Sequence, residues 1–584
     1  MTSWAVDEAG VVTRGGDPVA AGVVFENQES IRSALGLRFS NLTVSMVIES
    51  SGIFPDGLVL RVGVEKNAEV VHCSPDVDQQ VIEGTWHAVE PGSKSQVSEF
   101  LARHGATEGP MTAGLHFELV ADPVSVLILR DAVEHTPGVL GPPLPPPPDL
   151  EAVLFPYQLS GSTQLRRMAG ADIGCLLADE MGLGKTLQVI TLLTALPPGS
   201  RRTLVVAPRS ILFNWESELK KFSPLLTTRI HAGEFRPRVV GRFDNFDVTL
   251  VSYETLVQDL VFIREIQWDV VVLDEAQKIR NPDTRRAEAV KELRCRIPIA
   301  VTGTPVENGL QDLWSIAEFV IPPLLGSRPA FEEKFPDEVS AARRLGQLIK
   351  PITIRRRVAD VAGDLPEKTE FVVPLELIDE DRERYEAIGP AGLANHASLR
   401  VLCSHGQHTE ELRPPEFGER TKVEHLLSIL DELFENGQKA LVFTEYVKTL
   451  KRLVGEIGIR WPAAFVSAIY GATSPDDRPR ILEDFESHQG PGCLVMNPTV
   501  AGAGLNIQSA NHVIHFTPGY NPAVTRQATA RAWRVGQQNR VFVHHLYYKG
   551  TLEEDARMIS EIKTGLADGV DDGVEASTSA GENV

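Results

Sequence analysis

The residues with the clearest potential for chemistry lie in a loop between two apolar segments. The loop, Ala-Asp-Glu-Met-Gly-Leu-Gly-Lys-Thr at 178–186, follows the apolar run 173–177 and precedes an apolar, helix-favouring stretch. Backbone N–H groups at a helix N-terminus bind phosphate oxygens, a lysine reaches the outer phosphates and a threonine hydroxyl ligates Mg²⁺. Lys185 and Thr186 are therefore predicted to bind a nucleotide and its metal. Asp179 stands where the usual pattern begins with glycine, and an exposed turn at a helix start is the simpler alternative.

Two adjacent carboxylates, Asp274 and Glu275, directly follow the fully apolar run 270–273. Open α/β sheets place ligand-binding residues at the carboxyl ends of their strands. Asp274 can hold a hydrated Mg²⁺, and Glu275 can orient and deprotonate the water that attacks a phosphate. A solvated acidic turn would explain the pair taken alone, but the loop that contains Lys185 favours the catalytic interpretation.

A third candidate group, Arg531 and Arg534, lies far away in the sequence. Residues three apart project from one face of a helix. Two guanidiniums presented together can stabilise the charge that develops on a transferring phosphoryl group. Without the two earlier motifs, a basic surface face would be the better interpretation.

The elements that must position these residues form two series of short apolar runs that alternate with helix-favouring segments. Strands that are apolar on both faces indicate a parallel sheet covered by helices. We therefore expect an α/β fold with two parallel-sheet lobes in tandem, the second opening with a helix whose capping box joins Thr421 and Glu424. The runs are 204–207, 248–251, 270–273 and 297–301, then 440–443, 493–496, 512–516 and 541–543.

A proline-rich segment at 141–150 separates the lobes from the N-terminal part of the chain. Such a segment favours the polyproline conformation and typically links separately folded parts. Before it, β-favouring runs at 42–49, 57–64, 115–120 and 124–129 predict a small β-rich domain over residues 1–140. The boundaries expected after the linker are 151–325 for the first lobe, 326–420 for a helical insertion, 421–563 for the second lobe and 564–584 for a disordered acidic tail.

Composition restricts the class of protein. The 584 residues carry a net charge of −22, which disfavours nucleic acid as a partner. Residues 1–150 alone hold 8 basic and 20 acidic residues, however, so the remainder can still form a basic groove. No run is long and apolar enough to span a bilayer, and five dispersed cysteines fit no disulfide framework, so we expect a cytoplasmic protein without membrane contact. A metal site at Cys403, His405 and His408 is a weaker interpretation of that segment than a polar loop.

Taken in order, the motifs resemble those of the Swi/Snf-type ATP-driven DNA translocases in helicase superfamily two, especially the compact bacterial-like members. The similarity extends over most of residues 151–563. Further motifs carry it: Phe155-Pro-Tyr157-Gln158 (the adenine-contacting Q motif), 205–210 with Asn214-Trp215 (motif Ia), 301–308 with Leu313-Trp314-Ser315 (motif III), Arg355-Arg356-Arg357 (near the passage between lobes), Phe443-Thr444 (motif IV) and 497–506 (motif V).

The resemblance implies two RecA-like lobes with short helical insertions, ATP and Mg²⁺ bound between them, and duplex DNA contacted through its phosphates. The implied catalytic residues are Lys185, Asp274, Glu275, Arg531 and Arg534, with Thr186 and Asp274 holding Mg²⁺ through ATP. The implied nucleotide-binding residues are Tyr157, Gln158, Asp179, Glu180, Met181, Gly182, Leu183, Gly184, Lys185, Thr186 and Gln527. Thr302, Thr304 and Gly504 are the implied coupling residues, and Arg209 and Thr499 the implied DNA contacts.

Two positions depart from the usual family pattern: Gln277 stands where many members have histidine, and Glu307 where many have glutamine. The expected function is ATP-driven movement along duplex DNA or remodelling of protein–DNA complexes, in genome maintenance or anti-phage defence, with nucleoid association in a bacterium. A strand-separating DNA or RNA helicase and a nucleotide-switched DNA-binding scaffold are the alternatives. The acidic N-terminal domain is expected to dock a protein partner, to cover a basic groove as an autoinhibitory element, or to serve as a solvated surface only.

Overall fold

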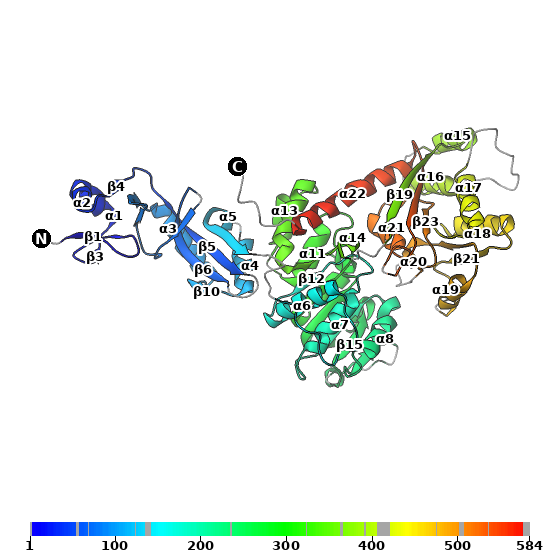
Figure 1. Cartoon of the computed structure of the whole chain (residues 1–584), viewed down its shortest axis with the longest axis horizontal. Helices are drawn as coiled ribbons and strands as arrows, with labels where there is room; N and C mark the ends of the chain where they lie inside the picture. The colour runs from blue at the N-terminus through cyan, green and yellow to red at the C-terminus, as the bar shows by residue number, and fades with distance from the viewer. Residues whose placement is uncertain are drawn as a thin grey trace.

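A computed structural model of the chain shows an N-terminal domain followed by two lobes, which a long C-terminal helix connects (Figure 1). The structure describes residues 3–575 except 54–57, 68, 123, 135–141, 234–235, 237, 244, 323, 362–365, 390–392, 406–420, 475, 502–506 and 535. Gly504 and His408 therefore lie outside the described residues. Among the helices in the described part, none is both long and apolar enough to cross a membrane.

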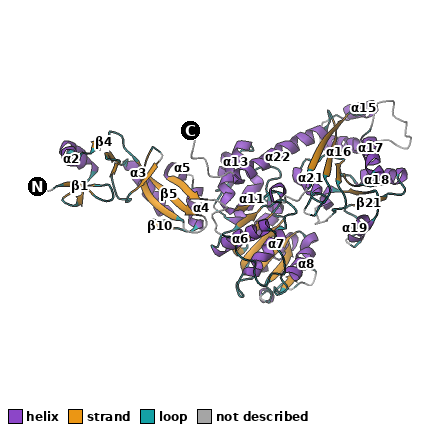
Figure 2. Cartoon of the chain, viewed as in Figure 1, coloured by secondary structure: helices purple, strands orange, loops and turns teal. Residues whose placement is uncertain are grey.

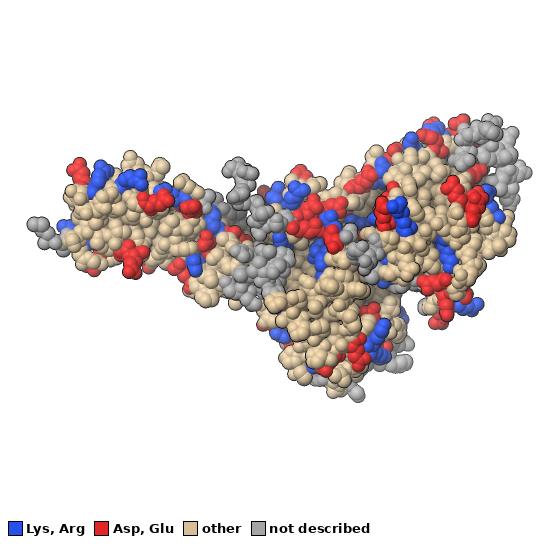
Figure 3. All heavy atoms as spheres, in the orientation of Figure 1, with Lys and Arg blue, Asp and Glu red and all other residues tan. Residues whose placement is uncertain are grey.

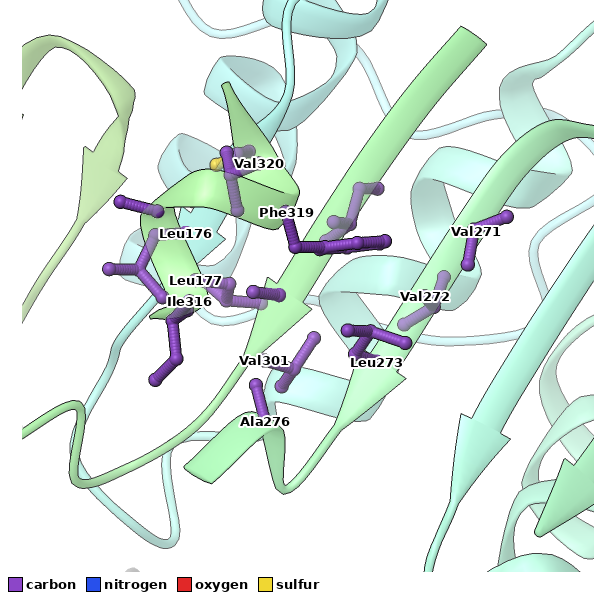
Figure 4. Close-up of a cluster of buried hydrophobic side chains, with 14 of the residues drawn as sticks. Leu176, Leu177, Val271, Val272, Leu273, Ala276, Val301, Ile316, Phe319 and Val320 are labelled. Carbon is purple, nitrogen blue, oxygen red and sulfur yellow. The ribbon is translucent and has the colours of Figure 1, made fainter. Parts of the chain in front are cut away.

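The first lobe is built on a seven-stranded sheet in which every neighbouring pair of strands is parallel. Each predicted apolar run forms one of its strands. Figure 4 shows Leu177, Leu273 and Val301 from three strands packed with Phe319 of a covering helix. The strand order is β14 (Thr228–Ile230), β15 (Val248–Ser252), β13 (Thr203–Ala207), β16 (Gln267–Asp274), β17 (Arg294–Val301), β12 (Cys175–Leu177) and β18 (Thr353–Ile354).

Helices flank this sheet on both faces, and its strands β12, β13 and β15 are buried along their whole length. Two of them matter for the site: α6 (Pro156–Gly170) and α7 (Lys185–Ala195), which pack against each other. The others that cover the sheet are α8 (Leu212–Phe222), α9 (Tyr253–Ile263), α10 (Arg285–Lys291) and α11 (Gln311–Val320).

The second lobe repeats this architecture with a six-stranded parallel sheet. It opens with α17 (Lys422–Glu435), where Thr421 and Glu424 form the predicted capping box. The strand order is β19 (Lys368–Leu375), β24 (Val541–Tyr548), β23 (His512–His515), β20 (Lys439–Phe443), β22 (Gly492–Met496) and β21 (Phe465–Ile469), with helices α18 (Val447–Arg460), α19 (Asp477–Ser487) and α21 (Pro522–Thr529) around it.

The interval 326–420, where we expected only helices, contributes a strand to each sheet. β18 pairs with β12 in the first sheet, and β19 lies at the edge of the second sheet beside β24. β18 is too short for sequence periodicity to detect, and β19 is a partly exposed edge strand without a continuous apolar run. The helices of this interval are α12 (Arg328–Lys334), α13 (Val339–Ile349), α14 (Val358–Val361), α15 (Asp379–Ile388) and α16 (Leu393–His405).

The described part of the N-terminal domain contains strands, as predicted, and also helices, of which α2, α3, α4 and α5 are labelled in Figure 2. The runs 115–120 and 124–129, which we expected to be strands, lie mainly in α4 (Ala113–Ala121) and α5 (Ser125–Ile128). A short apolar run does not distinguish a strand from a buried helix, and the Thr112 hydroxyl caps α4 by accepting from the Leu115 N–H. The remaining helices are α1 (Ala21–Glu26), α2 (Gln28–Leu35) and α3 (Pro91–Arg103).

The strands that the structure describes in this domain form three small sheets. The largest includes β5 (Ser45–Ile53) and β6 (Val59–Lys66), an antiparallel pair, with β11 (Leu129–Glu134) parallel to β5. The other strands are β7 (Glu69–His72) and β10 (Gly109–Pro110) in the same sheet, β1 (Trp4–Val6), β2 (Val12–Arg14) and β3 (Asp17–Pro18) in a second, and β4 (Arg38–Phe39), β9 (Thr85–Ala88) and β8 (Gln79–Ile82) in a third.

The proline-rich linker lies along helix α6 of the first lobe. The Leu144 N–H donates to Oγ1 of Thr163 at 3.0 Å, and Nη1 of Arg166 donates to the Pro145 carbonyl at 2.7 Å. Side chains of the N-terminal domain, including Phe117, also join the hydrophobic core of the first lobe. The described part of the linker is therefore fixed on the first lobe.

The expected disordered tail at 564–584 is wrong over its first twelve residues, because α22 (Leu552–Glu575) continues through them. Figure 1 shows this helix in red, running from the second lobe to α13 of the first lobe. Leu566 and Val570 are buried, and the small residues Gly569 and Gly573 allow the backbones of α13 and α22 to approach closely. The sequence has little apolar content here, so the packing partner stabilises this helix end. Residues 576–584 lie outside the described part.

Candidate nucleotide site

The candidate residues from both lobes converge on one pocket of about 390 Å³. The first lobe supplies the loop before α7 and the end of β16, and the second lobe supplies α21 and the turn that follows it. The predicted residues that line the pocket are Met181, Gly182, Gly184, Lys185, Thr186, Asp274, Glu275, Gln527, Arg531 and Arg534.

The loop before α7 has the backbone of an anion-binding site. Gly182 and Gly184 have φ of +88° and +72°, a region that side chains other than glycine rarely adopt, and α7 begins at Lys185. Nζ of Lys185 donates to the Asp179 carbonyl at 2.9 Å, and burial lowers the pKa of this lysine. A buried ammonium beside the N–H groups of a helix start fits a phosphate group.

Asp274 and Glu275 extend from the carboxyl end of β16. Oδ2 of Asp274 accepts from Nε1 of Trp215 at 2.7 Å, and the Tyr253 hydroxyl donates to the Asp274 carbonyl at 2.9 Å. Burial and then the charge of Glu275 raise the pKa of Asp274 to about 6. Two adjacent, half-buried carboxylates fit a divalent cation, which Asp274 and Thr186 would hold.

Arg531 and Arg534 reach the pocket from the second lobe, but they do not lie on a helix as we expected. Helix α21 ends at Thr529, and both arginines lie in the following turn. Burial and then the charge of Arg534 lower the pKa of Arg531 to about 10. Nε of Arg534 is buried without a hydrogen-bond partner in the described residues. A desolvated pair of guanidiniums fits a polyanion such as triphosphate.

A chain of hydrogen bonds leads from Glu275 into the first-lobe segment that resembles motif III. Oε2 of Glu275 accepts from Nε2 of Gln277 at 2.7 Å, and Oε1 of Gln277 accepts from the Thr302 hydroxyl at 2.8 Å. Oγ1 of Thr302 in turn accepts from the Thr304 N–H at 3.0 Å. Both threonines are buried, so the bond between them is protected from water.

The chain continues across the boundary between the lobes. The Thr304 hydroxyl donates to Oε1 of Glu307 at 3.2 Å, and Nδ2 of Asn521 donates to Oε2 of Glu307 at 3.2 Å. Asn521 is the N-cap residue of α21, the helix that carries Gln527. The two unusual residues of the sequence, Gln277 and Glu307, are both links in this chain.

Several residues predicted to contact nucleotide make bonds within the first lobe that support the loop. Gln158 is buried and donates to the Leu183 carbonyl at 3.3 Å. Asp179 is fully buried and forms an ion pair with Arg356, which also donates to the Tyr157 carbonyl. The carboxylate of Glu180 accepts from the Val358 N–H at 2.7 Å, and the Leu183 side chain is buried.

The two predicted DNA contacts lie outside the pocket, one on each lobe. Arg209 is exposed after β13, in a 3₁₀ turn, and Thr499 is exposed in α20 (Pro498–Ala501), where its hydroxyl donates to Oδ1 of Asn497 at 2.5 Å. Both are accessible to a partner.

Sequence reasoning missed the roles of two supporting residues. Trp215 lies in the segment that resembles motif Ia, and its indole N–H donates to Asp274. Arg356 lies in the arginine run 355–357, and it forms an ion pair with Asp179. A tryptophan and an arginine next to recognised motifs were the available signals, but only tertiary structure identifies their partners.

Two family models match the chain: the SNF2-related domain over residues 123–434 and the helicase conserved C-terminal domain over residues 421–536. The two matches adjoin near the start of the second lobe. Together they include every pocket-lining residue named above.

Individual relatives are similar over the same region. "Putative ATP-dependent helicase/translocase YwqA" of Bacillus subtilis is 33% identical over 495 residues, covering 78% of this chain and 52% of the relative. The Zorya protein ZorD of Escherichia coli is 34% identical over 438 residues, covering 65% of this chain and 40% of the relative. The chain thus spans about half the length, or less, of these curated relatives.

Among solved structures, the Sulfolobus solfataricus SWI2/SNF2 ATPase core in complex with dsDNA is 33% identical to this chain. The match covers 75% of this chain and 98% of that one, with a TM-score of 0.40.

Proposed function

The chain belongs to the SNF2-related family, and from this premise we propose that it is a DNA-stimulated ATPase that moves along duplex DNA. One observation carries the proposal: Lys185, Asp274 and Glu275 of the first lobe share a pocket with Arg531 and Arg534 of the second. A nucleotide switch does not need a complete set of hydrolytic groups. A set divided between lobes makes hydrolysis depend on lobe closure, which is how a motor couples chemistry to movement.

The residues divide the work of hydrolysis. Lys185 and the N–H groups at the start of α7 bind the phosphates, and Glu275 orients the attacking water and accepts its proton. Arg531 and Arg534 stabilise the negative charge that increases in the transition state. A Mg²⁺ ion bound at Thr186 and Asp274 would supply charge neutralisation at the phosphate oxygens.

The hydrogen-bond chain from Glu275 to Asn521 supports coupling between hydrolysis and lobe position. The links through Thr304 are buried, and those at Glu275, Gln277 and Asn521 are half-buried. Movement of α21 changes the position of Asn521 and therefore the support of Glu307. Thr302 and Thr304 transmit this change toward Glu275.

Duplex DNA is the proposed track, contacted mainly at its phosphates by groups that include Arg209 and Thr499. On the face in Figure 3, acidic and basic side chains are interspersed over both lobes. Phosphate contacts give binding that depends little on sequence and weakens as salt increases.

The proposed biological setting is genome maintenance or anti-phage defence, and ZorD among the similar proteins is one reason to test the second. The N-terminal domain packs on the first lobe, away from the second lobe (Figure 1). This position favours a role in docking a protein partner over covering a groove between the lobes.

The experiment that tests the proposal is steady-state ATP hydrolysis by the purified chain without nucleic acid and with duplex DNA, single-stranded DNA or RNA. Lys185→Ala controls for contaminating ATPases. We expect stimulation mainly by duplex DNA, together with ATP-dependent removal of a third strand from a triplex and no separation of an ordinary duplex. Stimulation mainly by single strands or RNA would favour a helicase instead, and hydrolysis in the control would invalidate the assay.

A further inference from the structure

The end of α22 forms a buried ion pair with the first arginine of the run 355–357. Nε and Nη2 of Arg355 donate to Oδ1 and Oδ2 of Asp571 at 3.0 and 2.7 Å. The two side chains are only 8% and 6% exposed. This bidentate geometry fixes the plane of the guanidinium, because two of its three nitrogens bond the two oxygens of one carboxylate.

The remaining nitrogen of Arg355 faces the nucleotide loop. Nη1 donates to the Ala178 carbonyl, where the loop begins, and to the Gly303 carbonyl at 3.4 Å. Gly303 lies against the loop so closely that an added Cβ would be 2.8 Å from Cγ of Met181 and 3.4 Å from Nζ of Lys185. One guanidinium therefore joins the C-terminal helix to two backbone segments beside the phosphate-binding lysine.

The loop backbone also pairs directly with the segment that contains Arg355. The Ala178 N–H donates to the Ile354 carbonyl at 2.8 Å, and the Glu180 N–H donates to the Arg356 carbonyl at 2.9 Å. A change in the position of Arg355 would therefore alter both amides. Hydrogen exchange at these amides reports on the loop without nucleotide or catalysis.

Helix α22 holds Asp571 in place because the helix is anchored at both ends. Near its start, Glu553 forms a fully buried ion pair with Lys422 of the second lobe. Near its end, an added Cβ on Gly573 would lie 2.1 Å from the Arg343 carbonyl of α13, so the two backbones are in direct contact. The position of Asp571 is thus fixed by both lobes.

We propose that Asp571 is a positioning residue of the ATP site, which acts through Arg355 to hold the nucleotide loop for hydrolysis. The inference rests on the proposed ATPase function. Without the Asp571 carboxylate, Arg355 is a buried cation without its counter-charge, and it reorients toward water or toward another acid. The Ala178 and Gly303 carbonyls then lose a fixed donor, and the loop samples geometries that place Lys185 poorly.

The test compares Asp571→Asn with Asp572→Asn in the full chain. Asp572 is the neighbouring exposed acid, paired at 3.4 and 3.5 Å with Arg343 and Arg357. We expect Asp571→Asn to lower kcat/KM for ATP about tenfold, since misplacement of a reacting group costs rate steeply. The control should resemble wild type. The DNA concentration for half-maximal stimulation should not change, because Asp571 is predicted to affect the nucleotide loop alone.

The second measurement is hydrogen exchange of the nucleotide-free protein. Peptides that cover residues 178–186 should exchange faster in Asp571→Asn than in Asp572→Asn, at equal thermal unfolding midpoints. Equal exchange in the two variants would overturn the proposal, as would a lower unfolding midpoint with unchanged kcat/KM per folded molecule. Higher ATP hydrolysis without DNA would also overturn it, because α22 would then restrain the site rather than support it.

A double variant tests the route of action. If Asp571 acts through Arg355, then Asp571→Asn should add nothing to the loss already caused by Arg355→Gln. Additive losses would contradict the proposed route. If wild-type protein hydrolyses no ATP under any condition, the proposed function fails, whereas the exchange comparison still tests the positioning of the loop.

Discussion

The two lobes share a parallel α/β architecture but present their reactive groups in different ways. In the first lobe, partners from the same lobe bond the groups in place: Lys185 to the loop carbonyls and Asp274 to Trp215. In the second lobe, Arg531 and Arg534 lie in a turn after a helix end, and burial lowers the pKa of both.

The difference indicates a division between binding and catalysis. Groups that are bonded before nucleotide arrives lose little freedom on binding, so they contribute to affinity. Two desolvated guanidiniums repel each other until an anion lies between them, and they gain most when phosphate charge increases in the transition state. The first lobe is thus suited to binding nucleotide, and the second lobe to accelerating its hydrolysis.

The largest expected effect comes from Arg531→Ala. Removing a guanidinium that stabilises the transferring phosphoryl group should lower kcat about 10⁴-fold. The matched control is Arg540→Ala, since Arg540 is a second-lobe arginine paired with Glu367 at the surface. Steady-state ATP hydrolysis with saturating duplex DNA measures both. A similar loss of kcat in both variants would show that the effect does not depend on the position of Arg531 in the pocket.

Glu275→Gln should lower kcat about 10³-fold, because the amide cannot accept the proton of the attacking water. Binding of a fluorescent ATP analogue should persist, since the other first-lobe groups are unchanged. Hydrolysis and analogue binding are measured on the same preparation. Unchanged hydrolysis would indicate that a different group activates the water and would favour a nucleotide switch.

The pH dependence of Mg²⁺ binding tests the acid of the first lobe. The pKa of Asp274 is about 6 without metal, and Mg²⁺ requires the carboxylate, so affinity for Mg²⁺ should fall about tenfold for each pH unit below that value. Trp215→Phe removes a hydrogen bond that lowers this pKa, so the fall should begin at higher pH. Mg²⁺ is titrated into wild type and Trp215→Phe with bound ATP analogue at a series of pH values. Identical pH profiles of Mg²⁺ affinity in the two proteins would contradict the assignment of Asp274 as the Mg²⁺ ligand.

The smallest expected effect comes from Asn521→Ala, which removes one hydrogen bond between the lobes. A loss of about 1 kcal/mol in closure corresponds to about a fivefold lower kcat, with unchanged affinity for nucleotide. Asn436→Ala is the matched control, since the bonds of this exposed residue within the described part of the chain stay inside α17 and its cap. A change in nucleotide affinity would show that Glu307 supports binding rather than coupling.

The sequence predicted the strands and motifs that depend on a local pattern of residues. Apolar runs identified most strands of both sheets, and the Gly-Lys-Thr loop and the Asp274-Glu275 pair were found from strand ends and spacing. Arg531 and Arg534 lie at the pocket, but the predicted helix was wrong because spacing alone does not show that α21 ends at Thr529.

The remaining features depend on contacts between distant segments. The helix through Glu575 exists because α13 packs against its glycines, and a polar, glycine-containing segment has no local signal for this. Asp179 faces Arg356 rather than a phosphate, which only the fold brings together. The links from Gln277 to Asn521 likewise join segments that lie far apart in the sequence.

The most direct test of the division between the lobes is the affinity for a slowly hydrolysed ATP analogue, measured side by side in Lys185→Ala and Arg531→Ala. We expect Lys185→Ala to lose most of the binding, whereas Arg531→Ala should bind nearly as well as wild type despite its low kcat. Equal loss of affinity in the two variants would contradict this division, because the second lobe would then contribute as much to binding as the first.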